Sequence, residues 1–154
     1  MTLLKLSNIV NTHLKNKLPL SSCSTLIDIH MKNFSYKDSL SFFNKLPKRY
    51  SVDFNPYGYR RIPIYEMDHM EMLLLEWKPK CVSPIHDHHE NGCIMVLLEN
   101  KLIEKRYCTK DQTLKETHHL PLLKAQYIDN SQNHHSICNE SKKDAALSLH
   151  LYPK

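Results

Sequence analysis

The stretch Ala145-Ala146-Leu147-Ser148-Leu149-His150-Leu151-Tyr152 has the clearest structural pattern in this 154-residue sequence. Apolar and polar residues alternate strictly, and successive side chains of a β-strand point to opposite faces. The stretch therefore predicts a strand with leucines on one face and Ser148, His150 and Tyr152 on the other. The polar face either meets solvent or lines the mouth of a barrel. In a barrel, Ser148 would hydrogen bond to His150, which would orient the Tyr152 hydroxyl.

Similar short stretches of strand-forming residues occur upstream, about ten residues apart and separated by turn residues such as Asn55-Pro56 and Lys78-Pro79. The predicted strands span residues 57–65, 71–77, 82–88, 93–98, 102–108, 113–119, 126–129, 135–139 and 145–152. This pattern indicates a mainly-β chain, with a sandwich or small barrel over residues 55–152. The turn at Glu99-Asn100 has no glycine, so we expect Asn100 to adopt the left-handed conformation there.

The first fifty residues predict a helical segment without obvious chemistry. Leucines, Ile9 and Val10 recur at helical spacing over residues 3–18, and Pro19 ends that pattern. A second helix is predicted to start at Ser24 and to bury one set of apolar side chains, namely Leu26, Ile27, Ile29 and Met31. A third is predicted over residues 39–46, before Pro47.

Length and composition favour one soluble domain over residues 1–154. Hydrophobic residues make up 41% and charged residues 24%, and no apolar run approaches the roughly 18 residues of a membrane span. Residues 1–11 lack the apolar core of a signal peptide, so we expect a cytoplasmic location. We also expect a monomer and no membrane partner.

Cysteine and charge usage exclude further classes of protein. The five cysteines are an odd number without a Cys-x-x-Cys pair, which argues against a disulfide framework and a zinc ribbon. The net charge of +5 is dispersed, and its densest points, Lys48-Arg49 and Arg60-Arg61, are too short for a nucleic-acid-binding arm. We therefore expect no nucleic-acid partner.

Candidate metal ligands lie in Ser83-Pro84-Ile85-His86-Asp87-His88-His89-Glu90-Asn91-Gly92-Cys93. On a strand, His86 and His88 share one face, and two neutral imidazoles can hold one metal ion. His134-His135 supplies a third imidazole from a distant strand. Glu90 is an alternative ligand if the strand continues, although Asn91-Gly92 indicates a turn.

Three motifs together resemble those of the cysteine dioxygenases, which are thiol dioxygenases of the cupin superfamily. They are Ser-x-x-His-Asp-His followed by Cys93, Tyr127-Ile128-Asp129-Asn130-Ser131 before His135, and Ser148-Leu149-His150-Leu151-Tyr152. The resemblance spans about residues 57–152. It implies a cupin-type β-barrel, or jelly roll, with one non-haem Fe(II) ion bound by His86, His88 and His135. His134 is the competing choice for the third ligand.

The resemblance also implies roles for other residues. Tyr59-Arg60-Arg61 is similar to the family's Tyr-x-Arg, in which Arg61 would bind the substrate carboxylate with help from Tyr59. A guanidinium suits that task because it can grip a carboxylate with two hydrogen bonds. Cys93 and Tyr152 match positions that a thioether joins in animal cysteine dioxygenases, and both are implied in catalysis with His150 and Ser148.

The implied activity is oxidation of L-cysteine by O2 to cysteine sulfinate. Alternatives are another small thiol substrate such as 3-mercaptopropionate, or a non-catalytic cupin that binds a metal or thiol as a sensor. Relatives that prefer 3-mercaptopropionate generally lack the carboxylate-binding arginine, so Arg61 favours cysteine. A zinc hydrolase is disfavoured because no carboxylate is clearly placed as general base. Trp77 and the four other cysteines are expected to be packing residues.

Overall fold

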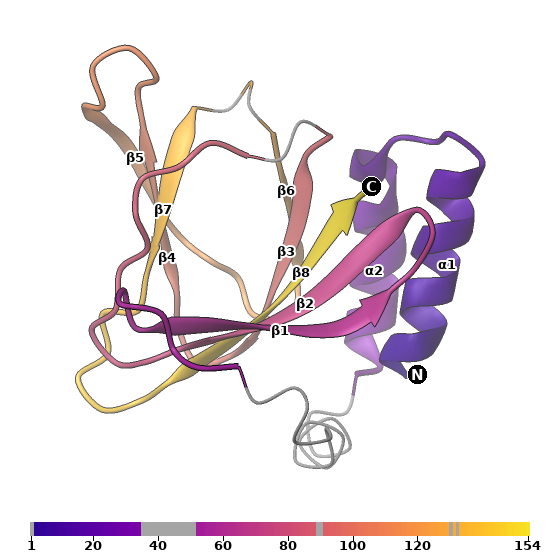
Figure 1. The fold of residues 1–154 in the computed structure, drawn as a ribbon, viewed down its shortest axis with the longest axis horizontal. Coiled ribbons are helices and arrows are strands. Elements are labelled where there is room, and N and C mark those ends of the chain that lie inside the picture. Colours follow the sequence, from indigo (N-terminus) through magenta and orange to yellow (C-terminus); the bar gives the residue numbers. More distant parts are fainter. Residues whose placement is uncertain (1, 35–51, 89–90, 130, 132) are drawn as a thin grey trace.

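The computed structural model of the chain describes residues 2–34, 52–88, 91–129, 131 and 133–154 (Figure 1). The predicted helix over residues 39–46 and the alternative ligand Glu90 lie outside these residues. The helices are α1 (Leu3–Lys15), a short 3-10 helix η1 (Leu20–Cys23) and α2 (Ser24–Lys32). The strands are β1 (Tyr59–Glu66), β2 (Met70–Trp77), β3 (Cys93–Glu99), β4 (Ile103–Tyr107), β5 (Leu114–His119), β6 (Ala125–Ile128), β7 (His134–Cys138) and β8 (Ala146–Pro153).

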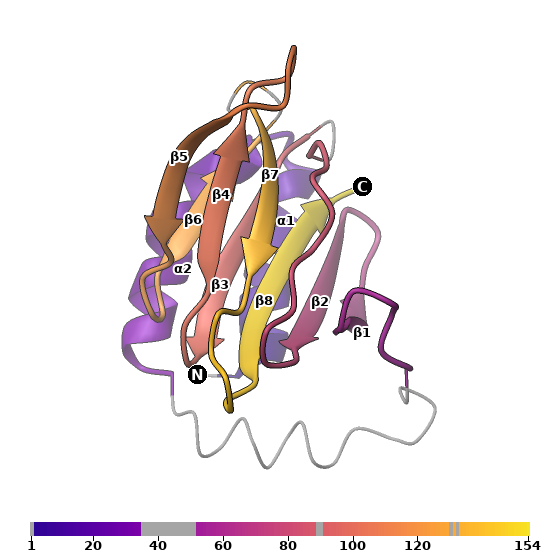
Figure 2. The same ribbon diagram turned by 90° about the vertical axis from the view of Figure 1, so that its left-hand side faces the viewer.

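The strands form two antiparallel sheets that lie one against the other (Figure 2). The larger sheet has the order β1-β2-β8-β3-β6, and the smaller has the order β5-β4-β7. The mainly-β, cupin-type fold is therefore confirmed, but within the described residues the two sheets are not closed into one barrel.

The prediction of a strand over residues 82–88 is wrong, and the smaller sheet therefore ends at β7. Residues 82–88 would have extended that sheet beyond β7, but they pair with β7 only through two isolated bridges, Val82 with Cys138 and His86 with His135. Pro84 lies between the bridges and has no backbone N–H to donate to a ladder. The segment that carries His86 and His88 is therefore a loop anchored at two points.

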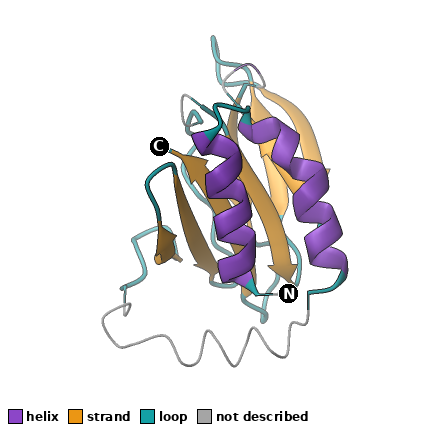
Figure 3. Cartoon of the chain, turned by 90° about the vertical axis from the view of Figure 1, so that its right-hand side faces the viewer, coloured by secondary structure: helices purple, strands orange, loops and turns teal. Residues whose placement is uncertain are grey.

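Both helices cover the outer face of the five-stranded sheet (Figures 1 and 3). The Thr2 side chain caps α1 by accepting a hydrogen bond from the Lys5 backbone N–H, and the helix ends before Pro19. In α2 only Ile27 and Met31 are buried, as expected for one stripe at helical spacing. The prediction that Leu26 and Ile29 also point inward is wrong, since 39% and 52% of their surfaces are exposed. Neither helix is long and apolar enough to cross a bilayer.

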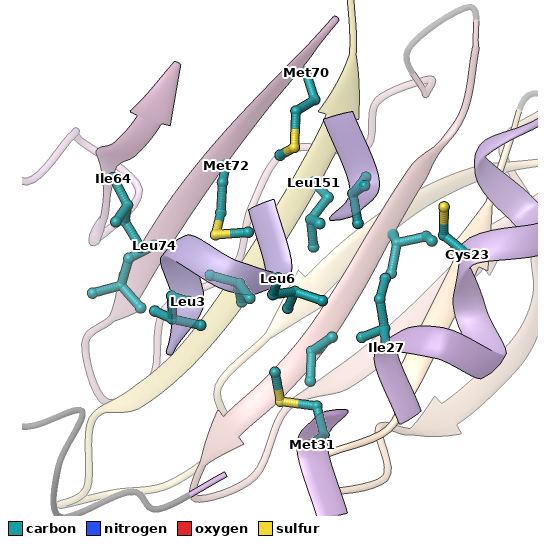
Figure 4. Close-up of a cluster of buried hydrophobic side chains, with 14 of the residues drawn as sticks. Leu3, Leu6, Cys23, Ile27, Met31, Ile64, Met70, Met72, Leu74 and Leu151 are labelled. Carbon is teal, nitrogen blue, oxygen red and sulfur yellow. The ribbon is translucent and has the colours of Figure 1, made fainter. Parts of the chain in front are cut away.

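The five-stranded sheet is buried on both faces, which gives the domain two apolar clusters. The first lies between sheet and helices and includes Leu3, Leu6, Ile27, Met70, Met72, Leu74 and Leu151 (Figure 4). The second lies toward the three-stranded sheet and includes Leu73, Leu75, Trp77, Met95, Leu97 and Ile137. Alternate residues of β2 therefore belong to different clusters, as the period of a strand requires.

The last strand follows the same rule. Leu149 and Leu151 of β8 lie in the helix-side cluster, so Ser148 and His150 must point between the sheets. Both side chains are buried, at 0% and 6% exposure, and the solvent-facing alternative for this face is wrong. Asn100 has a positive φ of 61°, which confirms its predicted left-handed conformation in the turn that leads from β3 toward β4.

Candidate metal centre

A cavity of about 210 Å³ lies between the two sheets. Its lining comes from six strands, β1, β2, β3, β6, β7 and β8, and from the loop between β2 and β3. It includes Tyr59, Arg61, Trp77, His86, His88, Cys93, His135, His150 and Tyr152. The cavity is smaller than the roughly 300–1,000 Å³ typical of drug-sized ligands. Its size therefore suits a ligand of few heavy atoms.

His86 and His135 are held together by their backbones. The N–H of each residue donates to the carbonyl oxygen of the other, with N···O distances of 3.0 and 2.9 Å. Their side chains consequently leave the paired backbones on the same side, and the two Nε2 atoms lie 3.1 Å apart. Two ligands at right angles on one ion, each about 2.0–2.1 Å from it, would be separated by about 3 Å. The spacing of these nitrogens therefore fits a shared metal ion.

The other ring nitrogen of His86 and of His135, Nδ1, already donates a hydrogen bond. His86 Nδ1 lies 2.8 Å from the carbonyl oxygen of Pro84, which can only accept, so this nitrogen carries a proton. His135 Nδ1 lies 2.8 Å from Oε1 of Glu104. Burial raises the pKa of Glu104, but its hydrogen bond with His135 and the positive charge of Arg106 outweigh this and keep the pKa below its usual value. Glu104 is therefore an anionic acceptor, and His135 Nδ1 also carries a proton.

These two Nδ1 hydrogen bonds determine what can lie between the His86 and His135 rings. In two neutral rings with protonated Nδ1, both Nε2 atoms present lone pairs, and two lone pairs face one another at 3.1 Å. Only a cation between them, either one shared proton or a metal ion, relieves that repulsion. The donor set thus fits a divalent metal that binds neutral imidazole.

His88 brings a third imidazole to the same place. Its ring centroid is 4.1 Å from that of His135 and 6.4 Å from that of His86, and the side chain is buried. Burial, together with the nearby His135 and His86 rings, lowers its pKa to about 4. His88 is therefore neutral near pH 7, the state in which imidazole binds metals.

Glu104 is a site residue that was not predicted from the sequence. Only 3% of its surface is exposed, and its Oε2 lies 3.0–3.1 Å from two guanidinium nitrogens of Arg106. Potential ligand atoms of His88, Glu104 and His135 all lie within 4.8 Å of one another. However, the carboxylate is occupied on one side by His135 and on the other by Arg106. Glu104 is therefore better placed to fix the tautomer of His135 than to bind the metal itself.

The strand β1 carries two adjacent arginines, Arg60 and Arg61, whose side chains have different surroundings. Arg61 faces the cavity, and its guanidinium carbon lies 5.6 Å from the centre of the Tyr152 ring. Among the described residues no carboxylate forms a salt bridge with it. The neighbouring Arg60 points away and pairs with Glu76 at 2.6 Å. Tyr59 stacks on Trp77 with 4.7 Å between ring centroids.

The polar face of β8 forms a hydrogen-bonded chain behind the cavity. Ser148 Oγ lies 2.9 Å from His150 Nε2, and His150 Nδ1 lies 3.4 Å from the Tyr152 hydroxyl. Burial, and then the charge of Arg61, lowers the pKa of His150 to about 3, so the ring is neutral. Trp77 extends the chain at its far end, because its Nε1–H donates to Ser148 Oγ at 2.8 Å. From the sequence, Trp77 was predicted only to be a packing residue.

Cys93 lies against the other end of this chain. Its sulfur is 4.0 Å from His150 Nδ1, and its side chain hydrogen bonds with that of Tyr152. Burial raises the pKa of the Cys93 thiol to about 12. Gly92 has φ +79°, and a Cβ there would lie 2.6 Å from the Tyr127 ring. A larger residue at position 92 would therefore displace the ring or the start of β3, where Cys93 lies.

The structure thus gathers the predicted site residues around one cavity. All of them line it except Ser148, which lies behind His150 and contacts its ring. His134, the competing third ligand, does not line the cavity and pairs with Tyr107 at the edge of the smaller sheet. The geometry favours His135 over His134.

Similarity to solved structures defines the class of fold. The chain resembles a cupin domain from Bordetella pertussis Tohama I, with 12% identity, a TM-score of 0.50 and coverage of 66% of this chain and 99% of that one. It also resembles an RmlC-like cupin from Shewanella frigidimarina NCIMB 400, with 9% identity, a TM-score of 0.51 and coverage of 71% and 87%. The chain therefore has a cupin-type fold.

Sequence similarity identifies the family. Residues 33–154 match the model of the family "Cysteine dioxygenase type I", and the chain belongs to that family. It is also 30% identical over 106 residues to cysteine dioxygenase type 1 of Danio rerio. That match includes 64% of this chain and 53% of the zebrafish protein, so the chain spans about half the length of this curated relative.

The first prediction concerns the third imidazole. His135→Ala removes the ring that faces His86, so affinity for Fe(II) or Co(II) should fall by more than the about 10–100-fold typical of losing an outer-shell partner. Anaerobic titration calorimetry measures this. The matched variant His134→Ala removes the adjacent imidazole and should bind the metal like the parent protein. Normal binding by His135→Ala combined with loss in His134→Ala would contradict this assignment.

Proposed function

We propose that this protein is an iron(II)-dependent thiol dioxygenase that converts L-cysteine and O2 to cysteine sulfinate. The observation that supports this most directly is the pair of His86 and His135 Nε2 atoms, 3.1 Å apart with both Nδ1 atoms committed as donors. With His88, these residues would hold the iron. The chemistry that bound iron(II) would supply is activation of O2 and deprotonation of a coordinated thiol.

Neutral ligands suit this role. Three imidazoles bring no negative charge, so the ion would keep its full charge toward the substrate thiol. Glu104 would contribute by holding His135 with Nε2 free of its proton, while Arg106 keeps the carboxylate anionic. Membership of the cysteine dioxygenase type I family favours iron over the other metals that bind imidazole.

Arg61 would select the substrate. A guanidinium in a small cavity, with no salt-bridge partner among the described residues, is suited to bind a carboxylate. Tyr59, on the same face of β1, would assist. Holding the carboxylate in this way would fix the thiol in one position and reduce the entropy lost on reaching the transition state.

Tyr152 and Cys93 would form a thioether crosslink beside the metal site. Ile94 of β3 pairs with Leu151 of β8, and the antiparallel register continued by one residue sets Cys93 opposite Tyr152. Directly opposite Cβ atoms lie about 4.5–5.5 Å apart. We infer that a thioether can join the sulfur to the phenol ring. The S–H and one ring C–H bond are lost, and two electrons and two protons pass to O2, the oxidant of the proposed reaction.

The setting of the enzyme is also a proposal. We infer one catalytic domain over residues 1–154, acting as a monomer in the cytoplasm. The free state of all five cysteines, four of them buried, supports a reducing compartment.

Oxygen uptake after anaerobic loading with Fe(II) tests the function. Cysteine, cysteamine and 3-mercaptopropionate should be compared in parallel, and the products identified by mass spectrometry. Iron-dependent uptake of one O2 per thiol, with cysteine sulfinate as product and cysteine preferred, is the expected result. Iron binding without oxygen uptake would instead indicate a sensor. Faster oxidation of 3-mercaptopropionate than of cysteine would show that cysteine is not the preferred substrate.

The second prediction separates the two arginines. Arg61→Ala should raise KM for cysteine by about 10- to 150-fold, because a charge-assisted hydrogen bond is worth about 1.5–3 kcal/mol. KM for cysteamine, which has no carboxylate, should change far less. Arg60→Ala is the matched control and should leave the ratio of the two KM values unchanged, since Arg60 pairs with Glu76. Equal losses for both thiols in Arg61→Ala would show a purely structural role.

The third prediction concerns the thioether. Protein turned over with iron and cysteine should contain a growing fraction of chains about 2 Da lighter, with the Cys93 and Tyr152 peptides joined. The link should survive reductant, unlike a disulfide. Cys93→Ser cannot form a thioether and serves as the control for the mass change. Recovery of the two peptides only as separate species after many turnovers would exclude the link.

A further inference from the structure

We propose that Trp77 is a positioning residue that sets the direction of the Ser148–His150–Tyr152 chain, so that the Tyr152 hydroxyl proton points toward Cys93 at the edge of the cavity. Trp77 lies on β2 beside β8, where Leu75 pairs with Ser148. Its indole is almost completely buried, at 2% exposure. Its consequence for turnover rests on the proposed dioxygenase function, whereas the hydrogen-bond direction itself does not.

The indole fixes one side of Ser148. An indole N–H can only donate, so Ser148 Oγ must accept the hydrogen bond from Trp77 across 2.8 Å. A serine hydroxyl has one proton to give, and that proton cannot point back at a donor. The Ser148 side chain is also fully buried, so bulk water does not reach it.

The remaining partner of Ser148 is His150. Within the described part of the chain, Ser148 Oγ hydrogen bonds with Trp77 Nε1 and His150 Nε2. If His150 donated from Nε2, Ser148 would receive two hydrogen bonds and its own proton would have no acceptor. The unmet donor disfavours that arrangement by about 5- to 150-fold. Ser148 therefore donates to a bare Nε2.

A bare Nε2 in a neutral ring places the proton of His150 on Nδ1. That nitrogen lies 3.4 Å from the Tyr152 oxygen and 4.0 Å from the Cys93 sulfur. The Tyr152 oxygen then accepts from His150, and its own O–H is directed toward the Cys93 side of the cavity. The hydrogen bonds run in one sense, from Trp77 through Ser148 and His150 to Tyr152.

Loss of the indole N–H would allow the hydrogen bonds of this chain to reverse direction. In Trp77→Phe an aromatic ring can still stack on Tyr59, but a water that enters the vacated space could accept the Ser148 proton. Ser148 could then accept from His150 Nε2, and His150 Nδ1 would lose its proton. His150 Nδ1 could then accept from Tyr152 or Cys93, and the Tyr152 proton would no longer be held toward Cys93.

Nitrogen-15 NMR of the metal-free protein tests this without any turnover. Long-range proton–nitrogen correlations of histidine-labelled protein report which ring nitrogen carries the proton, and His150→Gln identifies the His150 signals. The parent protein should show the Nδ1–H form in at least about fivefold excess. Trp77→Phe should move the ratio toward equality. Leu97→Val, which shortens a buried apolar side chain paired with Ser148, should leave it unchanged.

A second measurement uses the single tryptophan of the chain. Ser148→Ala removes the acceptor of the indole N–H, so the one indole N–H signal should shift and exchange faster with solvent. A predominant Nε2–H form in the parent, an unchanged tautomer ratio in folded Trp77→Phe, or an indole signal indifferent to Ser148→Ala would each overturn the proposal. Absence of thiol oxidation in a protein with the expected tautomer would overturn the proposed function alone.

Discussion

The site depends on one electrostatic constraint, which is that two imidazole nitrogens without protons face each other across 3.1 Å. The Pro84 carbonyl and the Glu104 carboxylate each take the proton-bearing nitrogen of one ring. Backbone hydrogen bonds between His86 and His135 prevent the rings from moving apart freely. A cation between the nitrogens is the simplest way to relieve the repulsion, and the neighbouring His88 ring adds a third neutral donor. The ligand geometry is thus built into the chain by its outer partners.

The two-sided sheet provides the rigid frame for these groups. Residues of β2, β3 and β8 alternate between the helix-side cluster and the cavity, so packing of Leu149 and Leu151 against the helices fixes where His150 and Tyr152 point. Covering the outer face with α1 and α2 therefore has a functional consequence. It leaves the inner face as the place where polar side chains are buried, and there each needs a hydrogen-bond partner.

Much of this was predictable from local pattern. The alternation around Ser148 and His150 gave the strand, and the matching motifs gave the cavity residues, because period and motif are properties of neighbouring residues. Glu104 was not found, since a Glu and an Arg on one face of a strand normally indicate solvent, and only the pairing of β4 with β7 brings Glu104 to His135. The role of Trp77 was missed for the same reason, because its acceptor lies on a strand distant in sequence. The interrupted strand at Pro84 is a local effect that the prediction gave too little weight.

The most direct test of this account is X-ray absorption spectroscopy of anaerobic protein loaded with one equivalent of Fe(II). Multiple scattering from imidazole rings counts the histidine ligands, and the account predicts three in both the parent protein and Glu104→Gln. An unchanged count in the variant would support a carboxylate that orients His135 from outside. Two imidazoles plus a carboxylate in the parent, with the carboxylate signal lost in Glu104→Gln, would contradict it.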